Sequence, residues 1–381
     1  MQIIINEIKK ILNRKMILLL FLVNAILYFL LINFHIEYFP NGRPALDSYN
    51  IGIEMIEKYG TGMDEAEMAD FKKTYDNQVK EADQLLQSRK EFRDVGIRSY
   101  EEFRNMEIEN REQHTLRHKI LFDEKVDMFW ELQERERLIE SHDQNKEIID
   151  TAISEASMGQ KERLEEIKVN ESFYVYPETA FENFKEFILS VAIAIIISVV
   201  LVISPIFIRD RSRQLIDLQY TAKTGRLLYK KKAIAGVLST LTVITALLAV
   251  YFSIYSLNNT AMFFPVPIYT FIGIGDYYWY DLSFIQYIML TVIAIYILGI
   301  AFALLAMSFS TIAPNFIALI GIQILIVFPM LTFGLNYLIN RIISYGLPKW
   351  LVPTSYCALI AVSVLFIFLL WKRERKMDIV Q

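Results

Sequence analysis

The chain has little cysteine, glycine and proline for its length. Among its 381 residues there is one cysteine, Cys357, so a disulfide within the chain is impossible. Any segment outside a membrane must therefore be held together by packing alone. Glycine and proline, 14 and 10 in total, are almost absent between Gly62 and Gly159, which favours long uninterrupted helices there.

Several catalytic and nucleotide-binding motifs are also missing. No loop of the type G-x-x-x-x-G-K-[ST] occurs, so ATP, if it drives this protein, binds to another chain together with magnesium. His114 and His118 have the i, i+4 spacing of a zinc pair but lack the glutamate of H-E-x-x-H, and a solvated helix face is the simpler interpretation. Because we find no nucleophile–base pair either, we expect no enzyme activity and no cofactor or metal in this chain.

Apolar residues make up 54% of the chain and are concentrated in long runs. A transmembrane helix needs about 20 largely apolar residues in a row. The sequence therefore predicts an all-α membrane protein with six transmembrane helices. The predicted spans are 16–36, 184–208, 229–255, 284–309, 314–338 and 353–371.

The central turns of these spans contain no Asp, Glu, Lys or Arg. Ion-coupled pumps usually keep an ionisable group inside the bilayer, so their absence argues against that class. No pair of matching three-span halves is found either, which argues against a transporter built on repeats. Four polar side chains within or at the edge of the spans either bond between helices or line a substrate path: Asn24, Asn33, Gln286 and Gln323.

The net charge of −4 hides a strong asymmetry along the chain. Residues 37–183 contain 35 acidic and 20 basic side chains, whereas basic residues dominate 1–15, 209–232 and 372–381. Lys and Arg near span ends stay on the cytosolic side. We therefore expect both termini and the 209–228 stretch inside, with 37–183, 256–283 and 339–352 outside. Because the bases lie at membrane edges, nucleic-acid binding is not expected.

The segments around the spans have patterns of their own. Residues 1–15 predict an amphipathic helix in the membrane interface, with bases toward lipid. Residues 37–183 predict an extracellular helical domain, because Asp64-x-x-Glu67 and Ser99-x-x-Glu102 are capping-box patterns. We expect the apolar loop 256–283 to enter the interface or pack on the spans. Residues 339–352 form either a short re-entrant helix or a surface loop, and 372–381 form a cytosolic tail.

The stretch "RDRSRQLIDLQYTAKTGRLLYKKK", residues 209–232, carries eight basic and two acidic residues between two spans. Asp210 or Ser212 is the expected N-cap of a helix, and Gly225 follows its expected end. The pattern predicts a short amphipathic helix at the cytosolic mouth of two spans, whose apolar side needs lipid, the rest of this chain or another protein. Its apolar residues are Leu215, Ile216, Leu218, Tyr220 and Ala222.

This layout resembles that of the permeases of the ABC transporter type-2 family. Their plan has an amphipathic N-terminal helix, six spans with both ends inside, a cytosolic helix after the second span, a short hairpin after the fourth and a broken segment before the sixth. The chain matches this order outside 37–183. The family's second-to-third loop has an acidic residue, a leucine-rich helix, Thr-Pro-x-Ser-Arg and a lysine entering the third span. The counterparts here are Asp210, Leu215, Leu218, Thr221 to Arg226 and Lys231 or Lys232, with Ala222 for proline, Thr224 for serine and Gly225 inserted.

The resemblance implies the membrane subunit of an ATP-driven exporter in the bacterial plasma membrane. Such a permease forms a homodimer or pairs with a second permease, and it recruits ATP-binding-cassette ATPase subunits that bind ATP and magnesium. Subgroups with a large extracellular helical insertion handle peptides, lipids or drugs, so a substrate of that kind is expected. The ATPase-coupling residues implied are Leu215, Ile216, Leu218, Tyr220, Thr221 and Arg226.

An alternative from a different class also fits the sequence. The chain is then a membrane-anchored receptor or scaffold, whose extracellular helical domain binds a peptide or protein partner while the spans only hold it in place. The two hypotheses differ at residues 215–226, which matter for an ATPase-driven permease and not for an anchor.

Overall fold

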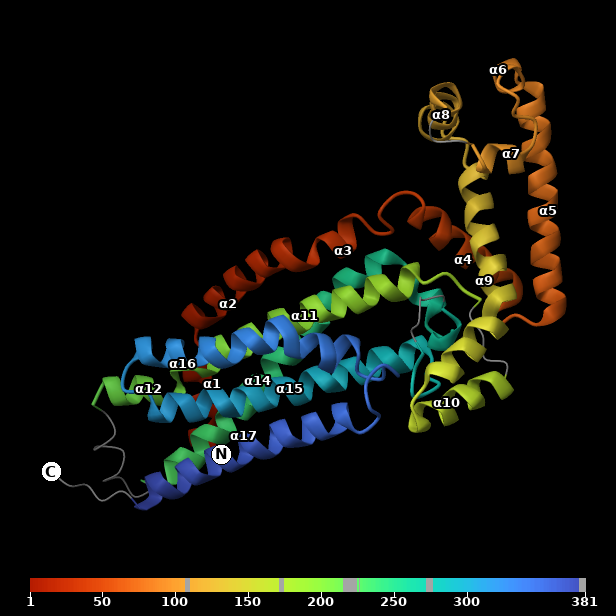
Figure 1. Cartoon of the computed structure of the whole chain (residues 1–381). Coiled ribbons are helices and arrows are strands. Elements are labelled where there is room, and N and C mark those ends of the chain that lie inside the picture. Colours follow the sequence, from red (N-terminus) through yellow and green to blue (C-terminus); the bar gives the residue numbers. More distant parts are fainter. Residues whose placement is uncertain (107–109, 171–174, 215–224, 226, 272–276, 377–381) are drawn as a thin grey trace. The chain divides into compact units, whose positions relative to one another are not determined.

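The structure is a computed structural model of the chain, and it describes residues 1–106, 110–170, 175–214, 225, 227–271 and 277–376. These residues are predominantly helical, and their strand-like pairings are isolated bridges such as Tyr176 with Phe271 and Pro267 with Ser283 (Figure 1). They form two compact units. We call Met1–Glu37, Phe184–Asn259 and Gln286–Gln381 the span unit, and Tyr38–Asn183 with Thr260–Ile285 the insertion unit.

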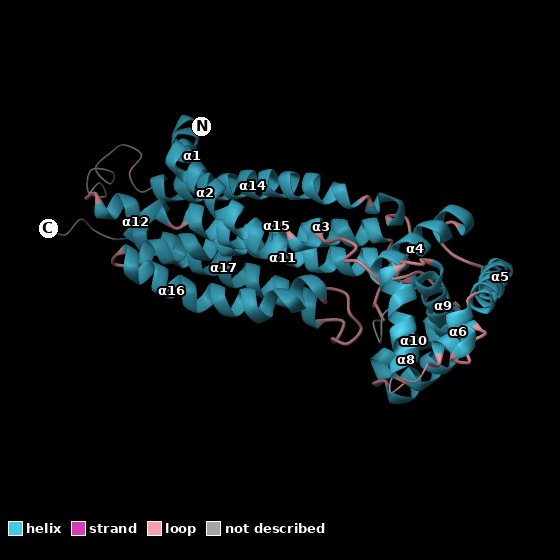
Figure 2. Ribbon diagram, turned by 90° about the horizontal axis from the view of Figure 1, so that it is seen from above, coloured by secondary structure: helices cyan, strands magenta, loops and turns pink. Residues whose placement is uncertain are grey.

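The span unit contains the long apolar helices. In Figures 1 and 2 alike, α11, α14, α15, α16 and α17 lie alongside one another. The helices that make up this unit or enter it are α1 (Gln2–Ile11), α2 (Arg14–Leu27), η1 (Tyr28–Ile32), α3 (Phe34–Glu37), α11 (Thr179–Ile203), α12 (Pro205–Ser212), α14 (Leu227–Tyr255), η3 (Ser256–Asn258), α15 (Phe284–Ile312), α16 (Phe316–Pro329), η6 (Met330–Gly334), η7 (Asn336–Asn340) and α17 (Leu351–Lys376).

The prediction of an all-helical chain with six apolar spans is confirmed for the described residues. Six helical segments are long and apolar enough to cross a membrane. They extend over Arg14–Ile32, Thr179–Ser212, Leu227–Asn258, Phe284–Ile312, Phe316–Gly334 and Leu351–Arg375.

Two boundaries differ from those expected from the sequence. The second segment extends to Ser212, although the apolar run stops at Ile208, because α12 continues beyond it. The fifth segment changes from α- to π-helix after Pro329, helical structure continues beyond Gly334 to Asn340, and residues 341–350 are mostly turns. Residues 341–350 are thus a loop, one of the two forms expected for this stretch, and not a re-entrant helix.

The N-terminal amphipathic stretch is α1. It packs against α14, and its buried residues are Glu7 and Ile11. Its position in a membrane interface stays a prediction.

The insertion unit is built around α9, which packs against α4, α5 and α10. Figure 1 shows α5 and α9 as two long neighbouring helices with α6, α7 and α8 at one end. The helices are α4 (Ala45–Tyr59), α5 (Glu65–Ser88), α6 (Lys90–Asp94), α7 (Tyr100–Arg104), α8 (Arg111–His118), η2 (Lys119–Asp123), α9 (Met128–Glu155), α10 (Met158–Val169), η4 (Thr260–Phe263) and η5 (Ile268–Thr270).

Both capping boxes predicted from the sequence are present in the insertion unit. The Asp64 side chain accepts from the Glu67 N–H at the start of α5, and Ser99 does the same for Glu102 at the start of α7. In each box the glutamate bonds back to the N–H of the capping residue, so two N–H groups that lack helical partners are satisfied. These caps fix where the two helices begin.

A hydrophobic cluster holds one end of the insertion unit together. The rings of Phe103 and Phe129 lie 4.5 Å apart, and Phe92 packs beside Phe103. All three are fully buried, and the cluster also includes residues of α5 and η2. Burying each aromatic side chain stabilises the fold by roughly 2–3 kcal/mol, which explains how the unit packs without disulfides.

The apolar loop after the third span is part of the insertion unit from Thr260 onward. Its Phe271 ring stacks on Phe181 at the start of α11, with the ring centres 5.3 Å apart. Its Thr270 carbonyl accepts from the N–H groups of Val175 and Tyr176, both at 2.8 Å. Arg163 of α10 donates to the Tyr278 carbonyl at 3.0 Å and forms an ion pair with Asp281. The loop is apolar because it supplies core to the insertion unit.

Candidate functional site

The second apolar segment is broken at Pro205. α11 ends at Ile203, and α12 begins with a proline that has no N–H and suits the first position of a helix. The next N–H groups of α12 lack partners within the helix. The buried hydroxyl oxygen of Ser310, in α15, accepts from Phe207 N at 3.1 Å and from Ile208 N at 3.0 Å. α15 therefore caps the start of α12.

The cap is reciprocal, because α12 also caps the end of α15. Arg211 donates to the carbonyl oxygen of Ala313 at 2.8 Å and to that of Thr311. The last carbonyls of a helix have no partner in the helix and carry its negative end, so a guanidinium there is stabilising. Tyr229 of α14 adds a hydrogen bond to the Thr311 hydroxyl at 3.2 Å.

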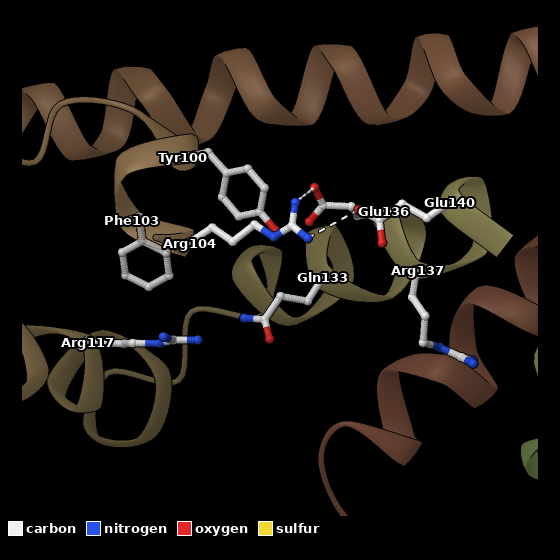
Figure 3. Close-up of a pocket in the computed structure, with 8 residues that line it drawn as sticks. All are labelled: Tyr100, Phe103, Arg104, Arg117, Gln133, Glu136, Arg137 and Glu140. Carbon is white, nitrogen blue, oxygen red and sulfur yellow. Dashed lines mark hydrogen bonds and ion pairs between the residues drawn. The ribbon is translucent and has the colours of Figure 1, made fainter. Parts of the chain in front are cut away.

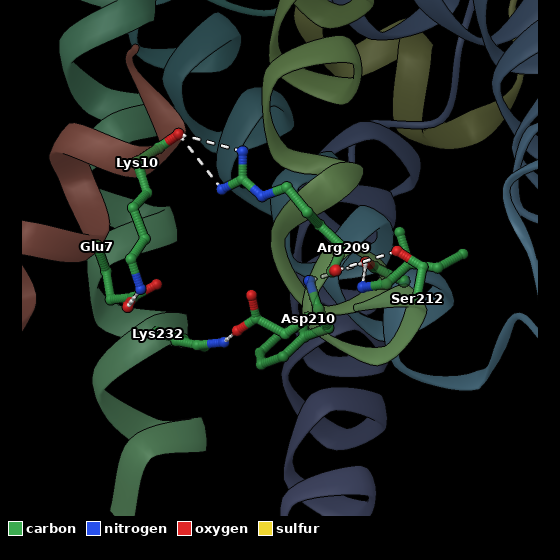
Figure 4. Close-up of polar contacts among 9 residues, drawn as sticks. Glu7, Lys10, Arg209, Asp210, Ser212 and Lys232 are labelled. Atoms are coloured by element: carbon green, nitrogen blue, oxygen red, sulfur yellow. Dashed lines mark hydrogen bonds and ion pairs between the residues drawn. The ribbon is translucent and has the colours of Figure 1, made fainter. Parts of the chain in front are cut away.

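A buried ion pair joins α12 to α14. The Lys232 ammonium contacts the Asp210 carboxylate, and the two side chains are only 3% and 11% exposed. Figure 4 shows them pointing toward each other from adjacent helices. Removing either charge would leave the other buried without a partner, which is costly. The pair therefore fixes the end of α12 against the start of α14.

The N-terminal helix reaches the same place. The Arg209 guanidinium donates to the Lys10 carbonyl oxygen at 3.3 and 3.4 Å, and the Lys10 ammonium pairs with Glu7 at 2.5 Å (Figure 4). Glu7 is buried against this surface. α1, α12, α14 and α15 are thus tied together by polar contacts. We call the set of Arg209, Asp210, Arg211, Lys232 and Ser310 the α12 clamp.

The α12 clamp lies at both ends of the basic stretch singled out from the sequence. Either Asp210 or Ser212 was expected to cap the start of a helix, but Asp210 lies inside α12 and Ser212 is its last residue. The apolar runs of the sequence did not reveal that the helix extends past Arg209. The proposed coupling residues lie outside the described residues: Leu215, Ile216, Leu218, Tyr220, Thr221 and Arg226.

An apolar cavity of about 450 Å³ lies between α11 and α16. Its walls are aliphatic and aromatic side chains such as Val200, Ile320 and Phe328. Its one polar feature is the contact of Gln323 with Ser204, in which the amide Nε2 donates to the hydroxyl oxygen at 2.7 Å. Of the four polar side chains proposed for a substrate path, Gln323 is the one that lines this cavity.

The other three proposed path residues lie elsewhere. Asn24 donates to the Ser198 hydroxyl at 2.8 Å and accepts from the Tyr251 hydroxyl at 2.7 Å, so it bonds three apolar segments together. Asn33 bonds to Glu37, one turn further along the same segment. Gln286 is exposed near the start of α15. The interhelical alternative fits Asn24, and the structure does not bring the four residues to one site.

The insertion unit carries charged clusters but no metal site in its described part. Among the described residues of the chain, no three His, Cys, Asp or Glu side chains are arranged to hold an ion. His114 lies on the exposed face of α8, and His118 makes a long contact of 3.9 Å with Asp123.

One buried carboxylate in the insertion unit is strongly perturbed. The Asp47 side chain is 3% exposed, and one of its oxygens has no hydrogen bond. Burial raises its pKa to about 6, and the nearby Glu131 and Asp127 add to the rise, while Arg43 at 3.4 Å opposes it. Folding at neutral pH therefore carries the cost of ionising this group in a poorly solvated place.

Comparison with protein-family models, with curated proteins and with solved structures finds no match for this chain. The function therefore has to be argued from the α12 clamp, the cavity and the insertion unit themselves.

Sequence reasoning missed two members of the α12 clamp. Ser310 and Arg211 act on the ends of helices that are about 100 residues away in the chain, so no local pattern marks them. A signal was present in Pro205, which ends one helix, begins another and leaves N–H groups that need a partner. Lys232 was noted as a residue entering the third span, without its partner Asp210.

Proposed function

We propose that this chain is the membrane permease subunit of an ATP-driven ABC transporter, an exporter of a peptide, lipid or drug-like substrate. The observation that carries the proposal is the α12 clamp, which ties the segment before the stretch 213–226 to α1 and α15, and joins it to the segment after the stretch through the pair of Asp210 with Lys232. A segment that transmits the conformational change of an ATPase to the spans has to be anchored in this way, because a flexible loop would move without moving the helices beside it. The resemblance of the span order to type-2 permeases supports the same function.

The α12 clamp suggests how the movement would spread. ATP binding in the partner ATPases presses the 213–226 stretches of two permeases together. Since α12 and α15 cap each other and Asp210 is paired with Lys232, a displaced stretch moves α15 and the start of α14 with it. Packed helices respond by sliding or tilting as rigid bodies, which opens a path between the two permeases.

The cavity between α11 and α16 supports an apolar or amphipathic cargo. Its volume of about 450 Å³ and its aliphatic walls suit an acyl chain or an apolar side chain, and the Gln323 amide supplies one polar contact. An ionic cargo would find no charged group in its lining.

The direct test is association with an ATPase. The chain is expressed with the ATP-binding-cassette ATPases encoded beside it, and the complex is purified from membranes. A triple variant, Leu215→Asp, Ile216→Asp and Tyr220→Asp, is expected to lose the ATPase. Leu257→Asp, a change of the same kind at an exposed position of η3, just after α14, is expected to keep it. The proposal fails if the wild-type chain binds no such ATPase or if the triple variant binds it equally well.

The orientation is tested separately with the single cysteine. In a Cys357→Ser background, a cysteine at the exposed Met158 is expected to react with a membrane-impermeant maleimide in intact cells. A cysteine at Ser212 is expected to react only after lysis. The opposite labelling pattern would place the insertion unit inside the cell and contradict the proposal.

A second candidate function is a membrane-anchored receptor or scaffold. The observation in its favour is that the insertion unit has its own hydrophobic cluster and its own cavities, as a binding domain would. It predicts that deleting residues 60–165 abolishes function while the Asp substitutions at 215, 216 and 220 change nothing.

A further inference from the structure

A small polar cavity lies in the insertion unit, among α7, α8 and α9. Its volume is about 240 Å³, and its lining includes Tyr100, Phe103, Arg104, Arg117, Gln133 and Glu136 (Figure 3). One water occupies about 30 Å³ of liquid, so the space equals roughly eight waters and fits a group the size of one amino-acid residue.

Most of the charges around this cavity are already neutralised by partners. Arg104 forms ion pairs with Glu136 and, at 3.2 Å, with Glu140. Arg137 is bonded to Glu134 at 2.7 Å and to Glu178 at 3.0 Å. These carboxylates are occupied and do not need a ligand.

Arg117 is the exception in this lining. Its guanidinium stands 5.9 Å from the centre of the Phe103 ring, and no carboxylate of the described residues lies within ion-pair distance of it. The aromatic ring holds the guanidinium in place through a cation–π contact while its N–H donors remain available. This is a preorganised cation in a concave site, within a segment that has a large excess of acidic residues.

One further polar group faces the same space. Figure 3 shows the Gln133 amide and the Arg117 guanidinium pointing toward each other across the cavity, and the Gln133 side chain makes no hydrogen bond to any described residue. An acceptor placed between Arg117 and Gln133 would receive donors from both sides.

We propose that this cavity binds the carboxylate of a small ligand, a peptide carboxyl terminus or a free amino acid, with Arg117 as its principal anchor and Gln133 as its second donor. A guanidinium fork matches the two oxygens of a carboxylate, and a charge-assisted pair of this kind is among the stronger hydrogen bonds. A dianionic phosphate fits less well, because Glu136 and Glu140 border the same cavity and would repel the second charge. The inference concerns what the insertion unit binds, and it stands whether the chain transports that ligand or only senses it.

The test measures binding to the purified full-length chain in lipid nanodiscs by titration calorimetry. The probes are the tripeptide Ala-Ala-Ala, the same tripeptide with a carboxyl-terminal amide, free alanine and inorganic phosphate. The tripeptide acid is expected to bind at least about tenfold more tightly than the amide, since the loss of a charged hydrogen bond commonly has that effect. Tighter binding of the tripeptide than of alanine identifies a peptide as the source of the carboxylate, and equal binding identifies an amino acid.

Three variants complete the design. Arg117→Gln is expected to weaken tripeptide binding about tenfold or more, and Arg117→Lys, which keeps the charge but loses the fork, to weaken it less. Arg111→Gln is the matched control, because Arg111 is exposed on the same helix and does not line the cavity. If Arg117→Gln does not fold, the comparison of acid and amide on the wild-type chain still decides.

Four results would overturn the inference. Two concern the ligands: equal affinity for the tripeptide acid and its amide, and tighter binding of phosphate than of the tripeptide. The other two are an equal loss of tripeptide affinity in Arg111→Gln and Arg117→Gln, and no binding of any probe by the wild-type chain at up to about 10 mM. None of them bears on ATPase association, so failure here is distinguishable from failure of the permease proposal.

Discussion

Breaking the buried pair between Asp210 and Lys232 gives the sharpest test of the α12 clamp. Lys232→Met keeps the apolar stem of the side chain and removes the charge, leaving Asp210 ionised at a site where its side chain is only 11% exposed. Removing one partner of such a pair typically costs about 3–5 kcal/mol. For a unit of this size that corresponds to a fall on the order of 10 °C in unfolding temperature. Lys230→Met is the matched control, because Lys230 is exposed and lies two residues before Lys232, and it is expected to change the unfolding temperature little.

The double variant separates coupling from simple loss of packing. Asp210→Leu with Lys232→Met removes both charges, and replacing a buried pair by apolar groups of similar size is often neutral or stabilising. We therefore expect the double variant to unfold within about 1 kcal/mol of the wild type, although each single variant is less stable. The assay follows the soluble, monodisperse fraction of detergent-purified protein after heating. If Lys232→Met unfolds at the wild-type temperature, or if the double variant loses the sum of the two single losses, the two residues are not a buried coupled pair and the reasoning is wrong.

Three further predictions concern single positions. Asp47→Asn should be more stable than the wild type at pH 7, because the raised pKa of Asp47 makes its ionised form costly. The free energy of unfolding of the wild type should rise by up to about 3 kcal/mol as the pH falls from above 6 to about 4. Chemical denaturation should show that Asp47→Asn lacks this part of the rise. Asn24→Leu should lower the free energy of unfolding by about 1–3 kcal/mol, since it leaves the hydroxyls of Ser198 and Tyr251 buried without Asn24 as a partner. An unchanged unfolding temperature in the same heating assay would refute the interhelical role of Asn24. Ser310→Ala should lower the free energy of unfolding by about 0.5–2 kcal/mol, because it removes the cap of α12. A smaller loss of stability, as expected for a surface serine, would contradict the cap.

The helical architecture was largely predictable because it depends on local patterns. Apolar runs of about 20 residues identify the six spans whatever their neighbours are. The two capping boxes, at Asp64 and Ser99, were also readable, since each involves residues three apart on one helix. Scarcity of glycine and proline favoured long helices between residues 62 and 159, where the structure has α5 and α9, and Phe92 and Phe103 lie in its hydrophobic cluster.

What the sequence could not supply depends on contacts between distant segments. Asp210 was expected as a cap because Asp is common there, but the structure uses it to neutralise Lys232. The loop 260–285 is apolar because it supplies part of the insertion-unit core, and hydropathy alone does not distinguish such a loop from one that contacts the membrane. Arg117 is likewise one of many arginines in the sequence, and only the cavity beside Phe103 distinguishes it.

We propose that a separate ATPase acts on this chain through the stretch between α12 and α14. The most direct measurement is purification of the tagged chain from the membranes of cells that encode it, with quantification of any co-purifying ATPase that carries a phosphate-binding loop. We expect such an ATPase at a ratio near one per chain, and its loss when Leu215, Ile216 and Tyr220 are changed to Asp. Recovery of the chain without any ATPase, or with equal ATPase in the wild type and the triple variant, would contradict the proposed function.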